Sequence, residues 1–499
     1  MDCLDRVVVV GVVGLTMTIA SSASKLPRTG PEPPAADAVS KRVHRIEHGL
    51  VPPLRIAGEP VVPRSLTAAM AESGIPALAL AIVDDCEVAW AGGWGTLEDE
   101  ETGVGGSTPF QVGSVSKMVT AVVAMTLVAE GRLDLDQRIN ELLTSWKLPD
   151  NKLTREHPVL VRHLLSHSAG LTRTAYWLDR NQPMPDLAAI LVGKTENPAI
   201  VVERVPGSRA IASNSGFLVL QSLLEDVSGM PLATLADKYV FARLGMNSSA
   251  FEPVDKRFLD HAATNHRSDG SAMEGRAPLI PGAPGGLWSS AEDLARLVAE
   301  LMKSWQGRPD GLLPRDLARQ MLSPQIGDMA LGIHLRGQGE GLSIQQAGGG
   351  IGSQARVIAF PGLCRGAALV INTDAGRRVV AETLAAVGQE YDWPDLPVVV
   401  EKIRLPSSDL ERFVGRYEYD AAPGSVMTFR VEGDTLVAQA GERTPLPLIR
   451  ASESVFVWPD SSSEMRFDPA VGGVIPGVTI GTAGFYGNHL SRLDAGERG

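Results

Sequence analysis

One helix constrains the fold of this chain more than any other feature of its sequence. The residues from Ser114 to Glu130 are apolar on nearly every face of the helix that they predict, and Gly131 marks its expected end. A helix that is apolar all round is stable only when other elements surround it. The 499 residues are enough for two or three domains, one of which we expect to be built around this helix.

A serine and a lysine stand three residues apart where this helix begins. Ser114 and Lys117 therefore share one helical face, and the helix dipole favours negative charge near Ser114. A serine hydroxyl needs a base, and a lysine amine can serve only if burial or a nearby cation lowers its pKa from about 10.4. An apolar helix entering a core supplies such burial. The spacing alone is weak evidence, because Ser22 and Lys25 repeat it.

Strand patterns lie on both sides of a long helical middle. The sequence PALALAIVDD followed by EVAWAGGWG predicts two strands joined at Asp84-Asp85 as a hairpin. Helices are expected at Phe217 to Val227, at Ala291 to Trp305 after the capping pair Ser289-Ser290, and at Arg378 to Tyr391. Further strands are expected at Ala330 to Leu335, Ala355 to Phe360 and Ala367 to Thr373. This order predicts one sheet built from both ends of a domain that spans residues 63–397.

A second domain is expected after a proline-marked linker, WPDLPVV, from Trp393 to Val399. Residues 405–499 contain short strand patterns such as RFVGRYEY, VMTFRVEG and TLVAQA, separated by Gly, Asp and Ser turns. The pattern predicts a small all-β domain of the β-barrel type.

The N-terminus carries an export pattern. Val7 to Ala20 form an apolar run that is too short to cross a bilayer as a helix, and the small residues Ser21 to Ser24 follow it. These features predict a signal peptide over residues 1–24 and a periplasmic or secreted protein with no stable membrane span after cleavage. An uncleaved anchor or a misassigned start is the alternative. Residues 25–62 are rich in Pro and basic residues and are expected to form an extension leading into the fold.

Two of the three cysteines fall in expected hairpin turns. In an exported protein, Cys86 and Cys364 would lie where a disulfide can persist. A disulfide between them and a pair of buried free thiols are both compatible with the sequence. Three cysteines cannot form a disulfide scaffold or a four-cysteine zinc site.

Charge and motif content exclude several classes of function. The formal net charge is −12 and there is no long Lys/Arg cluster, so a nucleic acid is not an expected partner. His163 and His167 have the i, i+4 spacing of a helical metal site, which makes metal-assisted hydrolysis one alternative. Their segment, VRHLLSHSAGL, favours packing or hydrogen bonding instead, and HExxH is absent. We therefore expect no metal and no cofactor. The absence of GxSxG argues against an α/β-hydrolase nucleophile elbow.

Several segments in a fixed order resemble one family of enzymes. GIPALALAIVD, WAGGWGT, TPFQVGSVSK, LLSHSAGL, PGSRAIASNSGF, FARLGMNSSAF and PGGLWSSAEDLARL together cover about residues 65–390. This part of the chain resembles the serine β-lactamase-like family, which includes class C β-lactamases, DD-peptidases and related esterases. The resemblance implies an α/β (α+β) fold, in which helices flank an antiparallel sheet and a helical insertion interrupts it. The C-terminal part looks like the small β-barrel domain often appended to these hydrolases.

The resemblance also implies a chemistry. Ser114 would be the nucleophile of an acyl-enzyme mechanism and Lys117 its proton-transfer partner, acting on a small-molecule or peptide-like ester, amide or lactam. The oxyanion hole would use the backbone N–H of Ser114 and one from the strand that begins near Gln346. Asn214, Gln346 and Gly348 occupy the substrate-binding positions of the family's second and third motifs. The sequence makes no prediction about oligomeric state.

Two motif positions depart from the family pattern. The second motif usually has a tyrosine two residues before its asparagine, and here that position is Ala212, which cannot transfer a proton. The third motif usually starts with Lys or His, and here Gln346 takes that place without a charge. Ser213 or Ser215 could substitute for the tyrosine only if the turn shifts register.

These departures leave two hypotheses. One is an active hydrolase whose deacylation is altered or slow, because a lost general acid or base costs roughly 10² to 10⁴ in rate. The other is a catalytically impaired protein that binds peptidoglycan-like or acyl ligands without turnover.

Overall fold

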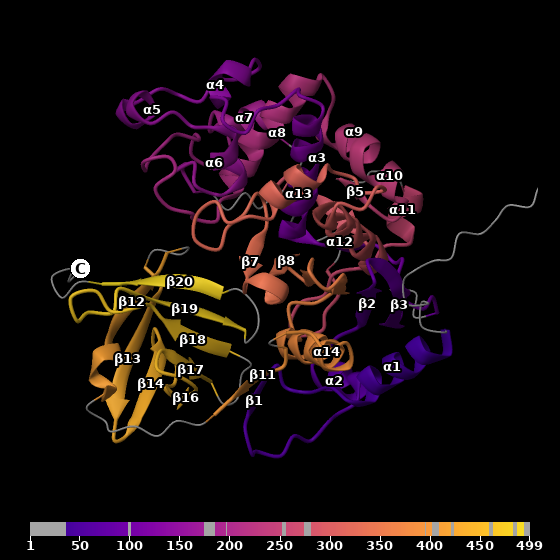
Figure 1. The fold of residues 1–499 in the computed structure, drawn as a ribbon, viewed down its shortest axis with the longest axis vertical. Coiled ribbons are helices and arrows are strands. Elements are labelled where there is room, and N and C mark those ends of the chain that lie inside the picture. The colour runs from indigo at the N-terminus through magenta and orange to yellow at the C-terminus, as the bar shows by residue number, and fades with distance from the viewer. Residues whose placement is uncertain are drawn as a thin grey trace, which may run out of the picture.

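The computed structural model contains a large α/β domain and a smaller β domain beside it (Figure 1). The expected signal peptide, residues 1–24, lies outside the described residues. The structure describes residues 36–493 except for 98–100, 174–184, 196, 252–255, 274–280, 395, 402–408, 421–423, 459–462 and 483–486.

A six-stranded antiparallel sheet forms the centre of the large domain, with strand order β3-β2-β10-β9-β8-β7. Its strands are β2 (Ala77–Asp84), β3 (Glu87–Gly95), β7 (His334–Arg336), β8 (Ser343–Gly350), β9 (Ser353–Phe360) and β10 (Arg365–Ile371). Strand β2, from the beginning of the domain, pairs with β10, from its end, and Ala79 lies opposite Val370. The predicted sheet built from both ends of the domain is therefore confirmed.

Several strand boundaries differ from the sequence prediction, since β9 begins at Ser353 and β10 runs from Arg365 to Ile371. The first hairpin turns at Asp85-Cys86, where φ is 51° and 59°, because the tight mirror-image turn requires two residues with positive φ. The strand expected from Ala330 begins only at His334. Gly332 has a φ of 79° and donates its N–H to the carbonyl of Leu165 at 2.9 Å, so the chain still bends there.

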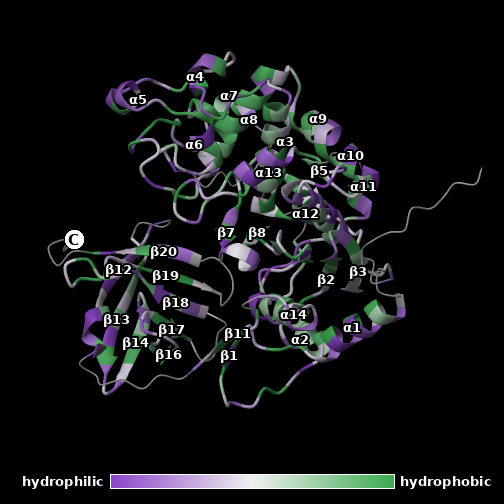
Figure 2. Ribbon diagram, viewed as in Figure 1, coloured by the Kyte–Doolittle hydropathy of each residue, from purple (hydrophilic) through white to green (hydrophobic). Residues whose placement is uncertain are grey.

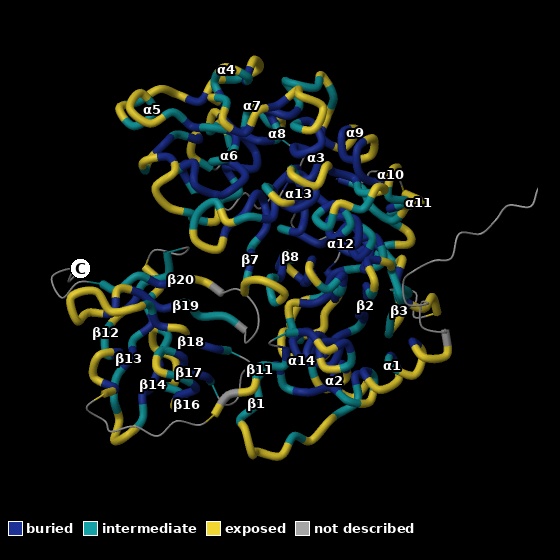
Figure 3. Tube along the Cα trace, in the orientation of Figure 1, coloured by how far each residue is buried: buried dark blue, intermediate teal, exposed yellow. Residues whose placement is uncertain are grey.

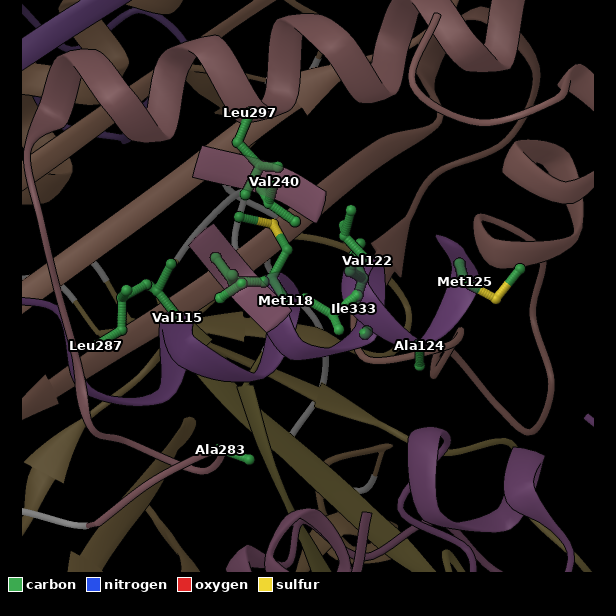
Figure 4. Packing of buried hydrophobic residues seen from close by; sticks show 14 of the residues in the cluster. Val115, Met118, Val122, Ala124, Met125, Val240, Ala283, Leu287, Leu297 and Ile333 are labelled. Carbon is green, nitrogen blue, oxygen red and sulfur yellow. The ribbon is translucent and has the colours of Figure 1, made fainter. Parts of the chain in front are cut away.

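The predicted central helix is α3 (Ser116–Ala129), preceded by the short helix η1 (Gly113–Val115). Twelve of the 14 residues of α3 are buried, as an all-apolar helix requires. Figure 4 shows its side chains among Val240, Leu297 and Ile333, which come from three other segments of the chain. The apolar colouring of α3 in Figure 2 matches its burial in Figure 3.

The two faces of the sheet pack against different helices. Alternate residues of β2 share one core with α3, α8 (Asn214–Ser228) and α12 (Ala291–Gln306). The intervening residues share a second core with α1 (Ala36–His48), α2 (Leu66–Glu72) and α14 (Arg377–Glu390). Further helices among the described residues of the domain are α4 (Ile139–Leu142), α5 (Lys152–Glu156), α6 (Val161–Leu165), α7 (Leu187–Leu191), α9 (Leu232–Ala236), η2 (Asp237–Phe241), α10 (Ala242–Leu244), α11 (Lys256–Asp260), α13 (Arg315–Met321) and η3 (Gly339–Gly341). A small sheet joins β4 (Phe110–Gln111), β6 (Leu287–Ser289) and β5 (Ala250–Phe251).

Part of the expected N-terminal extension belongs to the domain core. Within residues 25–62, helix α1 buries Val39, Val43 and Ile46 in the core that also contains α14. These side chains recur at helical spacing and form one apolar stripe. The Pro and basic residues of this segment outnumber the apolar residues of the stripe. For this reason its composition predicted an extension leading into the fold and not a part of the core.

The C-terminal domain is a nine-stranded antiparallel sheet with order β15-β14-β13-β12-β20-β19-β18-β17-β16. The first and last strands in that order are consecutive in the chain, so the sheet curves until it nearly closes. Aromatic side chains, including Phe413, Tyr417, Phe429, Phe456 and Phe467, fill its interior. Its strands are β12 (Gly415–Tyr419), β13 (Val426–Glu432), β14 (Thr435–Ala440), β15 (Leu446–Pro447), β16 (Ile449–Arg450), β17 (Val455–Val457), β18 (Ser463–Phe467), β19 (Gly477–Thr482) and β20 (Gly487–Arg492).

A disulfide links two hairpin turns of the large sheet. Cys86 lies in the turn between β2 and β3, and Cys364 lies in the turn between β9 and β10. The backbone N–H of Cys86 also donates to the carbonyl of Cys364 at 2.9 Å. The bond therefore ties the two ends of the domain together. In the described part of the chain, no helix has the length and apolar character needed to span a membrane.

Removing this disulfide should destabilise the protein. Because it joins residues 278 positions apart, the double variant Cys86→Ser/Cys364→Ser should lose about 3–5 kcal/mol of unfolding free energy. Urea unfolding of the two proteins measures the loss. Thiol labelling of the unfolded, unreduced wild type should detect neither cysteine, and two reactive thiols would contradict the bond.

Candidate active site

The start of α3 presents Ser114 at the edge of the core. Ser114 lies in η1 and is partly exposed, whereas Gly113 and Val115 on either side are buried. The hydroxyl of Ser116 fixes this turn, since it donates to the carbonyl of Gly113 at 2.6 Å and accepts the N–H of Leu287 at 3.0 Å. The turn therefore holds the Ser114 side chain at the surface of a rigid helix start.

The amine of Lys117 lies against Ser114. Lys117 Nζ donates to Ser114 Oγ at 2.9 Å and to the carbonyl of Pro284 at 2.7 Å, and it lies 5.9 Å from the centre of the Phe217 ring. The residue is only 5% exposed, and this burial lowers the lysine pKa to about 7. Near neutral pH the amine therefore exists in both protonation states. Its neutral form can keep the bond to Pro284 and accept the proton of the Ser114 hydroxyl.

Strand β8 passes directly beside Ser114. Gln346 Nε2 donates to the carbonyl of Ser114 at 2.9 Å. Gly348 approaches η1 so closely that a Cβ there would lie 2.0 Å from the carbonyl oxygen of Val112. Strand β7 pairs only with Ser343 to Gln345, so among the described strands the rest of β8 is paired on its β9 side alone. The unpaired edge of β8 thus borders the Ser114 turn.

The loop before α8 contains the residues that the family resemblance assigns to the second motif. Ser213 is the N-cap of α8, because its side chain accepts the N–H of Gly216 at 3.3 Å. Ala212 precedes it, and Asn214 begins the helix. The hydroxyl of Ser213 is therefore engaged in capping, and the hydrogen bonds of Lys117 Nζ go to Ser114 and Pro284. The one hydroxyl among these described partners of that amine is that of Ser114 itself.

His167 supports this loop and was not predicted as a site residue. Its Nδ1 lies 3.2 Å from the N–H of Ser213, and its carbonyl accepts the N–H of Ile211 at 2.9 Å. Burial lowers the pKa of His167 well below its usual value, and the nearby Lys117 lowers it further. The imidazole is therefore neutral and able to accept. The backbone of His167 has a φ of 56°, which is unusual for a residue other than glycine, and the sequence does not indicate this conformation.

Metal binding by the two histidines has no support in this geometry. The Nδ1 atom of His163 accepts the N–H of Leu160 at 3.2 Å, just as His167 accepts that of Ser213. The described residues contain no group of three or more His, Cys, Asp or Glu residues placed to hold a metal ion. Both histidines therefore hold neighbouring backbone segments in place by accepting hydrogen bonds from their N–H groups.

A comparison with protein families assigns the large domain. The profile described as "Beta-lactamase" matches residues 62–390, more than half of the chain. The chain belongs to the beta-lactamase family. The predicted family resemblance is therefore confirmed, and its antiparallel sheet with flanking helices is the fold described above.

Individual relatives of this beta-lactamase family member are distant. A Salmonella typhimurium protein with the provisional name D-alanyl-D-alanine carboxypeptidase is 21% identical over 238 residues, which are 44% of this chain and 54% of the relative. The chain thus matches about half the length of that relative.

Solved structures share the fold. The octameric penicillin-binding protein homologue from Pyrococcus abyssi is 22% identical, with a TM-score of 0.56 over 85% of this chain and 98% of that one. The D-amino acid amidase from Ochrobactrum anthropi is 19% identical, with a TM-score of 0.53 over 65% of this chain and 98% of that one.

Replacing Lys117 by methionine should stabilise the protein, and most strongly at low pH. The lysine pKa is about 7 in the fold but about 10.4 in the unfolded chain, so the unfolded state binds more protons between these values. Wild-type stability should therefore rise by about 1.4 kcal/mol per pH unit in that range, whereas Lys117→Met lacks this term. Urea unfolding at pH 6 to 9 measures the difference, with the exposed Lys152→Met as control. A pH-independent difference would contradict the lowered pKa.

Substituting Gly348 by alanine should disturb the site from the strand side. The new Cβ would meet backbone atoms of Val112 and Val115 at 2.0 and 2.7 Å, so β8 or η1 must move. We expect a loss of about 1–3 kcal/mol in the free energy of unfolding. Covalent labelling of Ser114 by a fluorophosphonate should be at least about tenfold slower. Gly103→Ala is the control, because nothing lies within 4 Å of a Cβ there. Equal behaviour of the two variants would argue against the close approach.

Proposed function

We propose that this protein is a serine hydrolase that forms an acyl-enzyme at Ser114. The observation that carries the proposal is the 2.9 Å contact between Lys117 Nζ and Ser114 Oγ, made by a buried amine whose pKa is about 7. A base with a pKa near the working pH is suited to proton transfer. The provisional name of the Salmonella relative and the name of the amidase favour D-amino-acid peptides, amides or esters as substrates.

Acylation follows from the arrangement of these groups. Neutral Lys117 takes the hydroxyl proton as Ser114 Oγ attacks the substrate carbonyl, and the resulting oxyanion lies between the N–H of Ser114 and an N–H on the open edge of β8. The ammonium of Lys117 then gives its proton to the leaving amine or alkoxide, and the acyl-enzyme remains. The buried Gln346 Oε1 accepts no hydrogen bond from the described residues, so a donor on the substrate would satisfy it.

Deacylation is the step that we expect to be slow. Water must attack the acyl carbonyl with a base to take its proton, and Ala212 removes the tyrosine that the family pattern provides there. Lys117 must then serve both halves of the reaction. The loss of one acid-base group costs roughly 10² to 10⁴ in rate, so the acyl-enzyme should accumulate.

A second candidate is acyl binding without turnover. It is supported by the absence of a charge at Gln346 and by the engagement of the Ser213 hydroxyl in capping α8. In that case the site would capture a peptidoglycan-like or acyl ligand.

We also propose that the protein acts outside the cytoplasm. The apolar run from Val7 to Ala20 and the disulfide between Cys86 and Cys364 support this, because disulfides persist in oxidising compartments.

Intact-mass spectrometry with a fluorophosphonate and with benzylpenicillin tests the acyl-enzyme directly. We expect one adduct per chain in wild type and none in Ser114→Ala, and labelling that rises with pH through about 7, where Lys117 becomes neutral. Release of the penicillin adduct over hours would indicate slow turnover, and a permanent adduct would indicate capture without turnover. No adduct, or an equal adduct in Ser114→Ala, would overturn the proposal.

A further inference from the structure

One residue of the C-terminal domain, Asp420, contacts two loops of the catalytic domain. Asp420 directly follows β12, and its side chain forms an ion pair with Arg209, three residues before Ala212. Its backbone carbonyl accepts a hydrogen bond from Arg173 at 2.9 Å. Arg173 follows LLSHSAGL, the segment that contains His167. One residue of the second domain therefore contacts both loops that organise the second motif.

Other side chains of the same domain hold the Asp420 carboxylate in place. Ser491 donates to its Oδ1 at 2.7 Å, and His489 Nδ1 lies 2.7 Å from its Oδ2. The other ring nitrogen of His489 lies 2.9 Å from Asp468. Burial would raise the pKa of Asp420, but hydrogen bonds from His489 and Ser491 and the charge of Arg209 together lower it. Asp420 is therefore ionised, and His489 and Ser491 hold its carboxylate in place beside Arg209.

The loop that receives this contact depends on polar anchors. Gly207 donates its N–H to the carbonyl of Ser168 at 2.7 Å, and Ile211 and Ser213 bond to His167 as described above. Arg209, Ile211 and Ser213 of this loop line a small cavity together with His167. Arg209 lies between the anchored residues 207 and 211. Its described ion pair with Asp420 joins the loop to the C-terminal domain.

We propose that Asp420 is a positioning residue through which the C-terminal domain holds the loop of residues 207–213 against the catalytic centre. The carboxylate fixes Arg209, Arg209 fixes the loop, and the loop sets the start of α8, where the Phe217 ring lies 5.9 Å from Lys117 Nζ. The catalytic part of this inference rests on the proposed function. The structural part does not, because loop order can be measured without any reaction.

Hydrogen exchange and acylation, both measured on the full-length chain, test the two parts. The variants are Asp420→Asn, Arg209→Gln and their combination, with Asp434→Asn as a matched control on the exposed β13–β14 turn. We expect Asp420→Asn and Arg209→Gln each to increase exchange at residues 208–213 several-fold. Each should slow acylation of Ser114 by fluorescent penicillin by roughly tenfold, because small displacements of reacting groups are costly. The final labelling stoichiometry should stay unchanged.

The double variant distinguishes positioning from general destabilisation. If Asp420 acts through Arg209, the double variant should be no slower than either single variant, since the second change removes nothing further. Additive effects, or a loss of rate without increased exchange in the loop, would overturn the inference. Increased exchange in a protein that no probe acylates would support the positioning role and overturn the proposed function instead.

Discussion

The structure depends on burying one apolar helix, and an amine at the start of that helix is buried with it. Helix α3 is stable only when surrounded, and surrounding it also encloses Lys117 against Ser114 and the carbonyl of Pro284. Burial of an ammonium is costly, and the same cost brings the lysine pKa into the range of a useful base. The packing that makes the domain stable is thus also what gives the serine a partner.

The sheet makes that arrangement rigid. Because β2 and β10 come from opposite ends of the domain, pairing them closes the whole helical insertion between two fixed points. The disulfide between Cys86 and Cys364 fastens the same junction covalently. Strand β8 can then lie close to η1, where only glycine fits at Gly348, and its open edge borders Ser114.

The C-terminal domain makes polar contacts with loops of the catalytic domain. Aromatic side chains pack in its core. Asp420, Ser491 and His489 form a polar cluster on the side that contacts the catalytic domain. That cluster contacts the loop in which Ala212 takes the place of the family's motif tyrosine.

The sequence by itself determined the elements whose signal is local. The apolar helix after Ser114, the spacing to Lys117, the hairpin near Asp85 and the altered Ala212 and Gln346 could all be read from neighbouring residues, and together with the motif order they predicted the family. Only the tertiary structure decided the rest. The part of α1 in the core, the backbone role of His167, the Pro284 carbonyl at Lys117 and the pair of Arg209 with Asp420 join residues far apart in the chain. Such contacts depend on how packed elements meet, and no local pattern encodes that geometry.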